Sequence, residues 1–403
     1  MFDYSLPYPS SRSPVFGRCI VSTSQPLAVG AGMRALAQGG NAIDAALAAA
    51  ITLTVVEPTS NGAGSDAFAI VWDGSALHGL NASGRSPGAW TPERFAGHST
   101  IPPRGWESVT VPGAVSGWVA LSERFGKLPF ERLFEAAVQY AREGYHVTPV
   151  IAAGWARNAH LYRGQPGYEE AFLPGGRAPR PGERFALPAL GDTLEAIAES
   201  RGTAFYEGRL AEAMVRHGAQ HGAAMTMEDL ATHQADWCGT MDTKFTNVEV
   251  HEIPPNGQGI ATLVALAILE HLEIGESPVD SLDSLHLQIE AMKLALADAE
   301  AYVADPDAMY VPPAALLERD YIANRAQLVD RSRAQDFGAG APKSGGTVYV
   351  ATADASGNMV SYIQSNYEGF GSGVVVPGTG ISLQNRGIGF TLQASHPNRV
   401  GPR

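Results

Sequence analysis

Residues 41–58 contain the segment that most restricts how this chain can fold. The sequence NAIDAALAAAITLTVVEP predicts a helix with Asn41 as its N-cap and the Asp44 carboxylate facing the unpaired amides of the first turn. Alanine and larger aliphatic residues occupy nearly all sides of this helix, so it has almost no polar face. A helix of this kind must be buried on several sides. The fold therefore needs layers of structure around it.

Strand patterns flank a long helical region. Residues 67–72 predict a strand that is followed by an Asp73-Gly74 turn and a second strand. The region from about residue 112 to residue 320 is mainly helical in pattern. Five apolar residues at helical spacing predict the buried face of its long helix: Leu285, Ile289, Met292, Leu296 and Val303. Helices on both sides of paired antiparallel sheet predict a layered sandwich of the α+β class.

A polar, glycine-rich segment precedes a hairpin near the end of the chain. Residues 336–346 predict a mobile linker, and TVYVATADASGNMVSYIQS predicts two strands around a turn at 355–358. Gly357 can adopt the positive φ that such a turn needs. Thr347 stands at the start of the first of these strands.

Thr347 could become a nucleophile if the Gly346–Thr347 bond were cleaved. The new α-amino group would then be a base on the same residue as the hydroxyl, and it titrates near pH 8. Gly345 and Gly346 permit the backbone angles for attack of the hydroxyl on the preceding carbonyl. The residues alone leave two interpretations open, a self-cleavage site and an ordinary linker before an edge strand.

Charge and composition exclude several function classes. A net charge of −13 argues against nucleic acid or an anionic membrane as partner. The two cysteines make neither a disulfide framework nor a metal motif. The first residues lack the pattern of a secretory signal, and the longest apolar run, residues 42–56, is shorter than the roughly 20 residues of a membrane span. We therefore expect a cytoplasmic protein.

Other catalytic motifs are missing from the sequence. It has no G-x-S-x-G, S-x-x-K, H-E-x-x-H or phosphate-binding G-x-x-x-x-G-K-[ST] pattern. His217 and His221 have the i, i+4 spacing of metal ligands, but no third ligand is evident. We interpret this pair as a solvated helix face, and we expect neither a metal nor an organic cofactor.

Several long motifs resemble one family in the right order. They are GGNAIDAALAAAITLTVVEPTSNGAGSDAFAIVWDG, SVTVPGAVSGWVALSERFG, PPNGQGIATLVALAILE, IEAMKLALADAEAYVADP and GTGISLQNRGIGF. The chain resembles the γ-glutamyltranspeptidase-like N-terminal nucleophile hydrolases. This resemblance implies a four-layer αββα sandwich and a proenzyme that cuts itself between Gly346 and Thr347. Residues 1–346 would then be the large-subunit portion, and residues 347–403 the start of a small subunit.

The resemblance also implies roles for the residues around the nucleophile. Ser365 stands where typical members have the threonine that hydrogen-bonds the nucleophile, so the hydroxyl is kept. Val348 replaces the second threonine of the usual Thr-Thr pair. Tyr367 occupies the place of a pocket asparagine, and it could close the acyl pocket or pack in the core.

The family's contacts to a glutamyl group are altered in this chain. The aspartate that pairs with the glutamyl ammonium falls on Gly389, and the arginine that binds the carboxylate falls near Ser83. Arg85 lies two residues further on, where it could bind a substrate carboxylate or close a turn. With a candidate cation and no recognised anion, the site suits a carboxylate-bearing amide without the α-amino group. The glutaryl, cephalosporin and oxamate branches of the family have such substrates.

Two other segments leave alternatives open. Asp66 could be a pocket acid, but a cap on the amides of the preceding glycine turn is the role we predict. The residues PPNGQG could line the site or could start the helix that follows them.

The small subunit of this family is longer than residues 347–403. Its later part carries the Gly-Gly amides of the oxyanion hole and serines of the acyl pocket, neither of which is found here. Each missing oxyanion donor would lower the rate by roughly 10²–10³. We therefore expect a C-terminally truncated sequence with weak or no activity as this chain alone.

The predicted function is a self-processing amide hydrolase with an acyl-enzyme on Thr347. Its partners would be a small-molecule amide and the two subunits made by self-cleavage, and a homodimer of these heterodimers is compatible with the resemblance. Two alternatives stay open: an authentic γ-glutamyl transferase or glutathione hydrolase, and a non-catalytic homologue used for binding or assembly.

Overall fold

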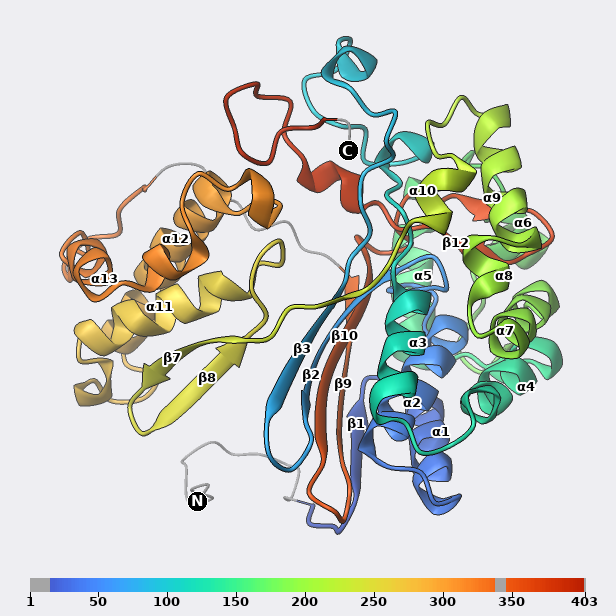
Figure 1. The fold of residues 1–403 in the computed structure, drawn as a ribbon, viewed down its shortest axis with the longest axis horizontal. Helices are drawn as coiled ribbons and strands as arrows, with labels where there is room; N and C mark the ends of the chain where they lie inside the picture. Colours follow the sequence, from blue (N-terminus) through green and yellow to red (C-terminus); the bar gives the residue numbers. More distant parts are fainter. Residues whose placement is uncertain (1–14, 338–345, 402–403) are drawn as a thin grey trace.

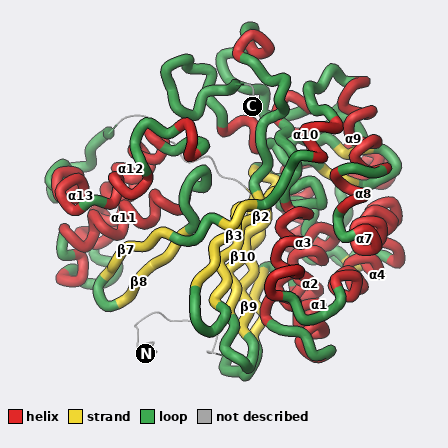
Figure 2. The backbone as a smooth tube through the Cα atoms, viewed as in Figure 1, coloured by secondary structure: helices red, strands yellow, loops and turns green. Residues whose placement is uncertain are grey.

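A six-stranded antiparallel sheet forms the centre of the computed structural model, which describes residues 15–337 and 346–401 (Figures 1 and 2). The two strands of the C-terminal hairpin lie between strands from the N-terminal part of the chain. In spatial order the strands are β1 (Ile20–Thr23), β9 (Gly346–Ala353), β10 (Met359–Tyr367), β2 (Asp66–Trp72), β3 (Leu77–Ala82) and β6 (Asp236–Trp237).

Helices cover one face of this sheet (Figure 1). They are α1 (Pro26–Ala37), α2 (Ala42–Val56), α3 (Ala114–Phe125), α4 (Glu135–Glu143), α5 (Pro149–Asn158), α6 (Tyr168–Phe172), α7 (Pro188–Ser200), α8 (Thr203–Tyr206), α9 (Arg209–Gln220) and α10 (Met227–Ala231). Two short strand pairs lie outside the main sheet. β4 (Tyr145–His146) pairs with β5 (Arg184–Phe185) between helices of this group, and β11 (Val375–Val376) pairs with β12 (Ile381–Ser382) after β10.

Helix α2 lies at the middle of the main core, as predicted. All of its residues are buried, between α1 and α4 on one side and β9 and β10 on the other. The Asn41 side chain accepts from the Asp44 N–H, and the Asp44 carboxylate accepts from the Asn41 N–H. The Asp44 carboxylate also accepts from the N–H groups of Lys127 and Leu128, so it holds a second segment against the helix start.

A smaller unit with its own core lies on the other side of the sheet (Figure 1). It consists of the hairpin β7 (Met241–Phe245) and β8 (Val248–Glu252) with α11 (Gly259–His271), α12 (Leu282–Tyr302) and α13 (Arg319–Ala326). The α+β class is therefore confirmed. The second sheet has only these two strands among the described residues, so the four-layer arrangement stays a prediction.

The predicted buried face of α12 is largely wrong. Leu285, Ile289 and Met292 are 45%, 58% and 39% exposed, whereas Val303 is buried as expected. The helix packs on α11 through another face, with these residues buried: Leu287, Ala291, Leu294, Ala295 and Ala299. Small alanines let the two helices approach closely. Two apolar stripes lie on one helix, and spacing alone could not tell which of them packs.

Both predicted hairpins are present. β2 and β3 pair across the Asp73-Gly74 turn, and β9 and β10 pair across a turn in which Gly357 has φ +91°. Residues 338–345 of the predicted linker lie outside the described residues.

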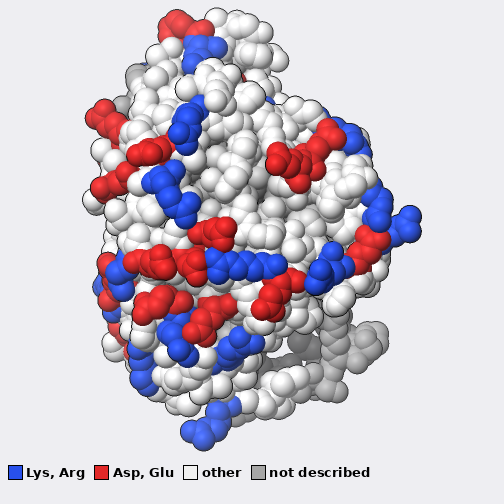
Figure 3. Space-filling view, turned by 90° about the vertical axis from the view of Figure 1, so that its right-hand side faces the viewer, with Lys and Arg blue, Asp and Glu red and all other residues white. Residues whose placement is uncertain are grey.

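On the face of the molecule seen in Figure 3, no large region carries charges of one sign only. Acidic and basic side chains are interspersed there, over the side of the molecule that carries α4 and α7. Arg142 on α4, for example, binds both Asp192 and Glu195 on α7. Among the helices of residues 15–337 and 346–401, none has the length and apolar character needed to cross a membrane.

Candidate active site

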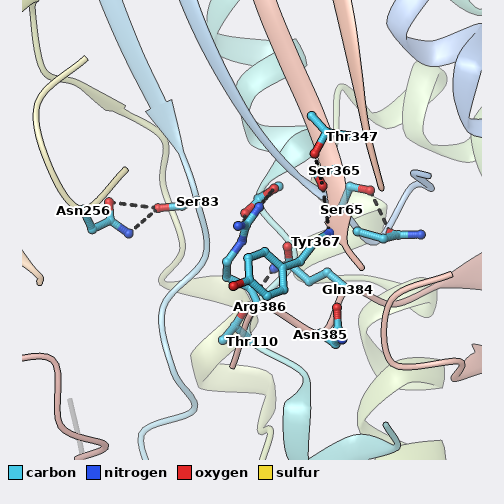
Figure 4. Close-up of polar contacts among 12 residues, drawn as sticks. Ser65, Ser83, Thr110, Asn256, Thr347, Ser365, Tyr367, Gln384, Asn385 and Arg386 are labelled. Carbon is cyan, nitrogen blue, oxygen red and sulfur yellow. Dashed lines mark hydrogen bonds and ion pairs between the residues drawn. The ribbon is translucent and has the colours of Figure 1, made fainter. Parts of the chain in front are cut away.

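The ends of three central strands, β9, β10 and β2, lie side by side at one end of the six-stranded sheet. They bring Thr347 and Ser365 together. β9 begins where the antiparallel β10 ends, and β2 begins on the other side of β10, with Asp66 opposite Ser365. The Thr347 Oγ1 and Ser365 Oγ atoms are 3.1 Å apart, and either hydroxyl can be the donor. Figure 4 shows the two side chains pointing toward each other. The two residues predicted as catalytic are therefore in contact.

Ser365 also fixes the backbone at the end of β10. The Tyr367 N–H donates to the Ser365 Oγ at 2.8 Å. A register shift between Gln364 and Tyr367 interrupts the pairing with β9, and Gly346 is the residue opposite Tyr367. Tyr367 has φ +79°, a conformation that costs a non-glycine residue about 1–3 kcal/mol. This bulge turns the Tyr367 ring out of the regular strand pattern.

The nucleophile candidate and its neighbour face opposite sides of the sheet. Thr347 is exposed, together with Tyr349, on the face away from α2. Val348 is fully buried in the main core under the helices. Successive side chains of a strand alternate between faces. The second threonine of the usual pair is thus replaced here by a residue that packs in the core.

Asp66 forms an ion pair that the sequence analysis did not predict. Both carboxylate oxygens accept from Arg386, from Nε at 2.6 Å and from Nη2 at 2.9 Å. The expected cap on the glycine turn is wrong, because the Ser65 Oγ accepts from the Gly62 N–H instead. Asp66 is the first residue of β2 and lies beside Ser365, where the Arg386 side chain reaches it.

Arg386 lies against the ring of Tyr367. Its guanidinium carbon is 4.5 Å from the ring centroid, which is the geometry of a cation–π contact. Burial raises the pKa of Tyr367, and the nearby Arg386 opposes this shift. The phenol therefore stays protonated at neutral pH and can donate a hydrogen bond.

A second ion pair involves Glu368, the residue that follows Tyr367. The Glu368 carboxylate accepts from Arg104 Nη1 at 3.0 Å, and the Glu368 N–H donates to the Asn385 Oδ1. The Arg104 guanidinium in turn lies over the Tyr162 ring. Both carboxylates near the site, Asp66 and Glu368, thus already have an arginine partner.

Arg85 and Ser83 lie on the segment that leaves β3. Arg85 is exposed, and in the part of the chain that the structure describes its guanidinium forms no salt bridge. Its carbonyl accepts from the N–H of the distant Val111, so this bond joins two separate segments and closes no local turn. Ser83 shares hydrogen bonds with Asn256, so the PPNGQG segment contacts this region and also precedes α11 (Figure 4).

Gly389 leaves open space where the family has an aspartate. It ends a short 3₁₀ helix, Arg386–Gly389, and a Cβ atom built on it would meet no heavy atom within 4 Å. The position therefore holds no anion, and it has room for one.

Buried amides support the site from behind. Ser65 donates to the Asn366 Oδ1, and the Gln384 Nε2 donates to the Thr110 Oγ1 (Figure 4). Gln364 accepts from the hydroxyl of Tyr362 and donates to Asn61. These bonds hold the ends of β2 and β10 in fixed positions beside Thr347.

A metal ion would need its own group of ligating side chains. Among the described residues there is no group of three or more His, Cys, Asp and Glu side chains that could hold a metal ion. His217 is buried against Trp106, so the predicted solvated pair is wrong for this residue. Burial and the neighbouring His221 lower the pKa of His217.

The sequence analysis missed Asp66–Arg386 as a pair. Arg386 stands within GTGISLQNRGIGF and Asp66 within GSDAF, so both segments had been recognised. The two residues are 320 positions apart, and no local pattern links them. Their opposite charges were the one feature of the sequence that could have suggested this ion pair.

Comparison with known proteins identifies the family. The γ-glutamyltranspeptidase family model matches residues 28–403. The glutathione hydrolase-like YwrD proenzyme of Bacillus subtilis is 36% identical over 98% of this chain and 75% of its own length. The oxamate amidohydrolase proenzyme of Klebsiella pneumoniae is 37% identical over 91% of this chain and 70% of its own length.

A solved structure agrees with these matches. The crystal structure of cephalosporin acylase from Bacillus halodurans superposes with a TM-score of 0.92 and 46% identity, covering 100% of this chain and 76% of the acylase. The fold, the family model and the relatives lead to one assignment: the chain belongs to the γ-glutamyltranspeptidase family.

Proposed function

We propose that this chain is a self-processing amide hydrolase whose nucleophile is the hydroxyl of Thr347. The observation that carries the proposal is the 3.1 Å contact between the Thr347 and Ser365 hydroxyls at the start of β9, directly after Gly346. The proenzyme names of the relatives support it. So does the exposure of Thr347 on its face of the sheet, which leaves the hydroxyl accessible.

The first step of the proposed function is cleavage of the chain. The Thr347 Oγ attacks the Gly346 carbonyl, and the C–N bond breaks as the acyl group moves to oxygen. Water then hydrolyses this ester, which leaves a Gly346 carboxylate and a free Thr347 α-amine. Ser365 acts here as a positioning residue, because its hydroxyl contacts the attacking oxygen.

The second step is hydrolysis of the amide substrate. The Thr347 Oγ attacks the amide carbonyl, and the α-amine accepts the hydroxyl proton and passes it to the leaving amine. Water releases the carboxylic acid from the acyl-enzyme and restores the hydroxyl. An amine in place of water would make the same chain an acyltransferase.

The charges of the site favour a substrate that carries a carboxylate and no α-ammonium group. An ammonium group needs an unpaired anion when it is buried. Asp66 and Glu368 are both paired with arginines, and Gly389 supplies no carboxylate. We therefore favour oxamate- or glutaryl-type amides over γ-glutamyl amides. Parallel hydrolysis assays with amides of the three types test this preference. An authentic γ-glutamyl transferase would hydrolyse the γ-glutamyl amide fastest.

Intact-mass spectrometry tests the proposal directly. The purified wild-type chain should give two fragments that divide between Gly346 and Thr347, and the smaller should begin Thr-Val-Tyr. The Thr347→Ala variant should give one uncut mass, whereas Thr347→Ser keeps a hydroxyl and should still be cut. The same masses are measured on a form extended at its C-terminus to the length of the relatives, and a chain that stays uncut in both forms would favour the non-catalytic alternative, a binding or assembly protein.

A further inference from the structure

We propose that Arg386, held by Asp66 and stacked on Tyr367, is the residue that binds the substrate carboxylate. This inference rests on the proposed function, because it concerns the acyl side of the same site. It replaces Arg85, the residue that the sequence analysis favoured. The ligand class is a short dicarboxylic half-amide, with the scissile amide at one end and a free carboxylate at the other.

The first support is the geometry of the guanidinium. Asp66 uses the edge formed by Nε and Nη2, through two hydrogen bonds of 2.6 and 2.9 Å. Within the described residues, Nη1 has no hydrogen-bond partner. The side chain is 29% exposed, whereas its partner Asp66 is 1% exposed. The edge formed by Nη1 and Nη2 is therefore available for a second carboxylate.

The second support is that the side chain is fixed before any ligand binds. The buried carboxylate of Asp66 holds one edge, and the Tyr367 ring holds one face at 4.5 Å. Tyr367 itself is held in an uncommon backbone conformation by its bond to Ser365. A cation that is already oriented loses little conformational entropy on binding. Strain of this kind is found where a site needs a fixed shape.

The third support is the position beside the nucleophile. Asp66 lies directly opposite Ser365 on the neighbouring strand, so the two side chains share one face of the sheet. Ser365 contacts Thr347, and Figure 4 shows Arg386 and Tyr367 next to this pair. A short acyl chain with its carbonyl at Thr347 therefore directs its far end toward Arg386.

Arg85 lacks these features. Its guanidinium is exposed and forms no salt bridge among the described residues, so no partner orients it. An exposed, unoriented cation is screened by salt and contributes little specificity. It serves as the matched control: the same residue type, outside the ion pair.

Equilibrium binding on uncut protein tests the inference. The Thr347→Ala background removes the nucleophile, so the result does not depend on self-cleavage. Titration with glutarate, and with the uncharged glutaramide of the same length, is followed by calorimetry. Arg386→Gln should weaken glutarate binding by about 10- to 100-fold, the loss expected for hydrogen bonds to a charged group. Arg85→Gln should change it by less than about twofold.

Folding is controlled separately, because Arg386→Gln leaves Asp66 buried without its cation. The double variant Asp66→Asn/Arg386→Gln leaves no unpaired buried charge at this position. Circular dichroism checks that it is folded. It should bind glutarate as weakly as the single variant does.

Three results would overturn the inference: unchanged glutarate affinity in the folded double variant, an equal loss in Arg85→Gln, or equal affinity of the background protein for glutarate and glutaramide. Failure of the proposed function would show instead as a wild-type chain that stays uncut both at this length and in the C-terminally extended form, whatever these titrations give.

Discussion

Replacing Ser365 with alanine should slow self-cleavage without unfolding the chain. The hydroxyl forms a hydrogen bond with Thr347 Oγ1 at 3.1 Å and accepts another from the Tyr367 N–H at 2.8 Å. In the proposed cleavage, the first bond would position the attacking oxygen. The second holds the bulge that ends β10, so its loss also loosens the backbone around the nucleophile.

The size of the effect follows from these two bonds. Losing them costs about 1–3 kcal/mol, since Ser365 is buried and the Tyr367 N–H loses its acceptor. If this cost falls on the transition state for cleavage, the rate drops by about 5- to 150-fold. Ser365→Thr keeps the hydroxyl and should process within about fivefold of wild type.

The assay is a time course of intact mass on freshly purified protein. Ser361→Ala is the matched control, because Ser361 lies on the same strand and its hydroxyl donates to the hydroxyl of the exposed Tyr349 at 3.2 Å. Both variants should unfold cooperatively in urea. Cleavage of Ser365→Ala at the wild-type rate would refute the role assigned to the Thr347–Ser365 contact.

Three further perturbations test other parts of the structure. Burial, assisted by Arg85, lowers the pKa of His233 to about 4. The unfolded imidazole titrates near 6.5, so the stabilisation is complete above that pH and is lost as the pH falls toward 4, by up to about 3 kcal/mol. Urea unfolding at pH 7 and pH 4.5 should show this dependence in wild type and not in His233→Gln. Gly389→Asp places an anion in open space, and it should raise the ratio of γ-glutamyl to glutaryl hydrolysis; an unchanged ratio would count against our account of substrate choice. Asp44→Ala leaves the half-buried N–H groups of Asn41 and Leu128 without an acceptor, so it should lower the free energy of unfolding by about 1–3 kcal/mol, and Asp44→Asn should lower it less.

Much of the fold could be predicted because its signals are local. The cap at Asn41, the apolar helix after it and the Gly357 turn each follow from residues that are neighbours in sequence. The packing face of α12 could not be predicted. Both of its apolar stripes have helical spacing, and the choice between them depends on the distant helix α11.

Some residues of the candidate site could likewise be predicted from the sequence, and others could not. Thr347 and Ser365 could be placed by motif, and the structure brings them into contact. Asp66 and Arg386 could not be paired from sequence, because the contact joins the start of β2 to a segment beyond β10. The direction of the Tyr367 side chain likewise depends on a bulge. It could not be predicted, because one register shift does not change the alternation of apolar and polar residues along the strand.

The strand order has a consequence for the fate of a cut chain. β9 and β10 belong to the segment after Gly346, and they lie between β1 and β2, which belong to the segment before it. Each fragment would thus hold the other through backbone hydrogen bonds on two sides. Cleavage would create a new chain end without creating a free subunit. The two pieces would separate only when the sheet unfolds, so a protein that shows two bands under denaturing conditions should still migrate as one particle in its native state.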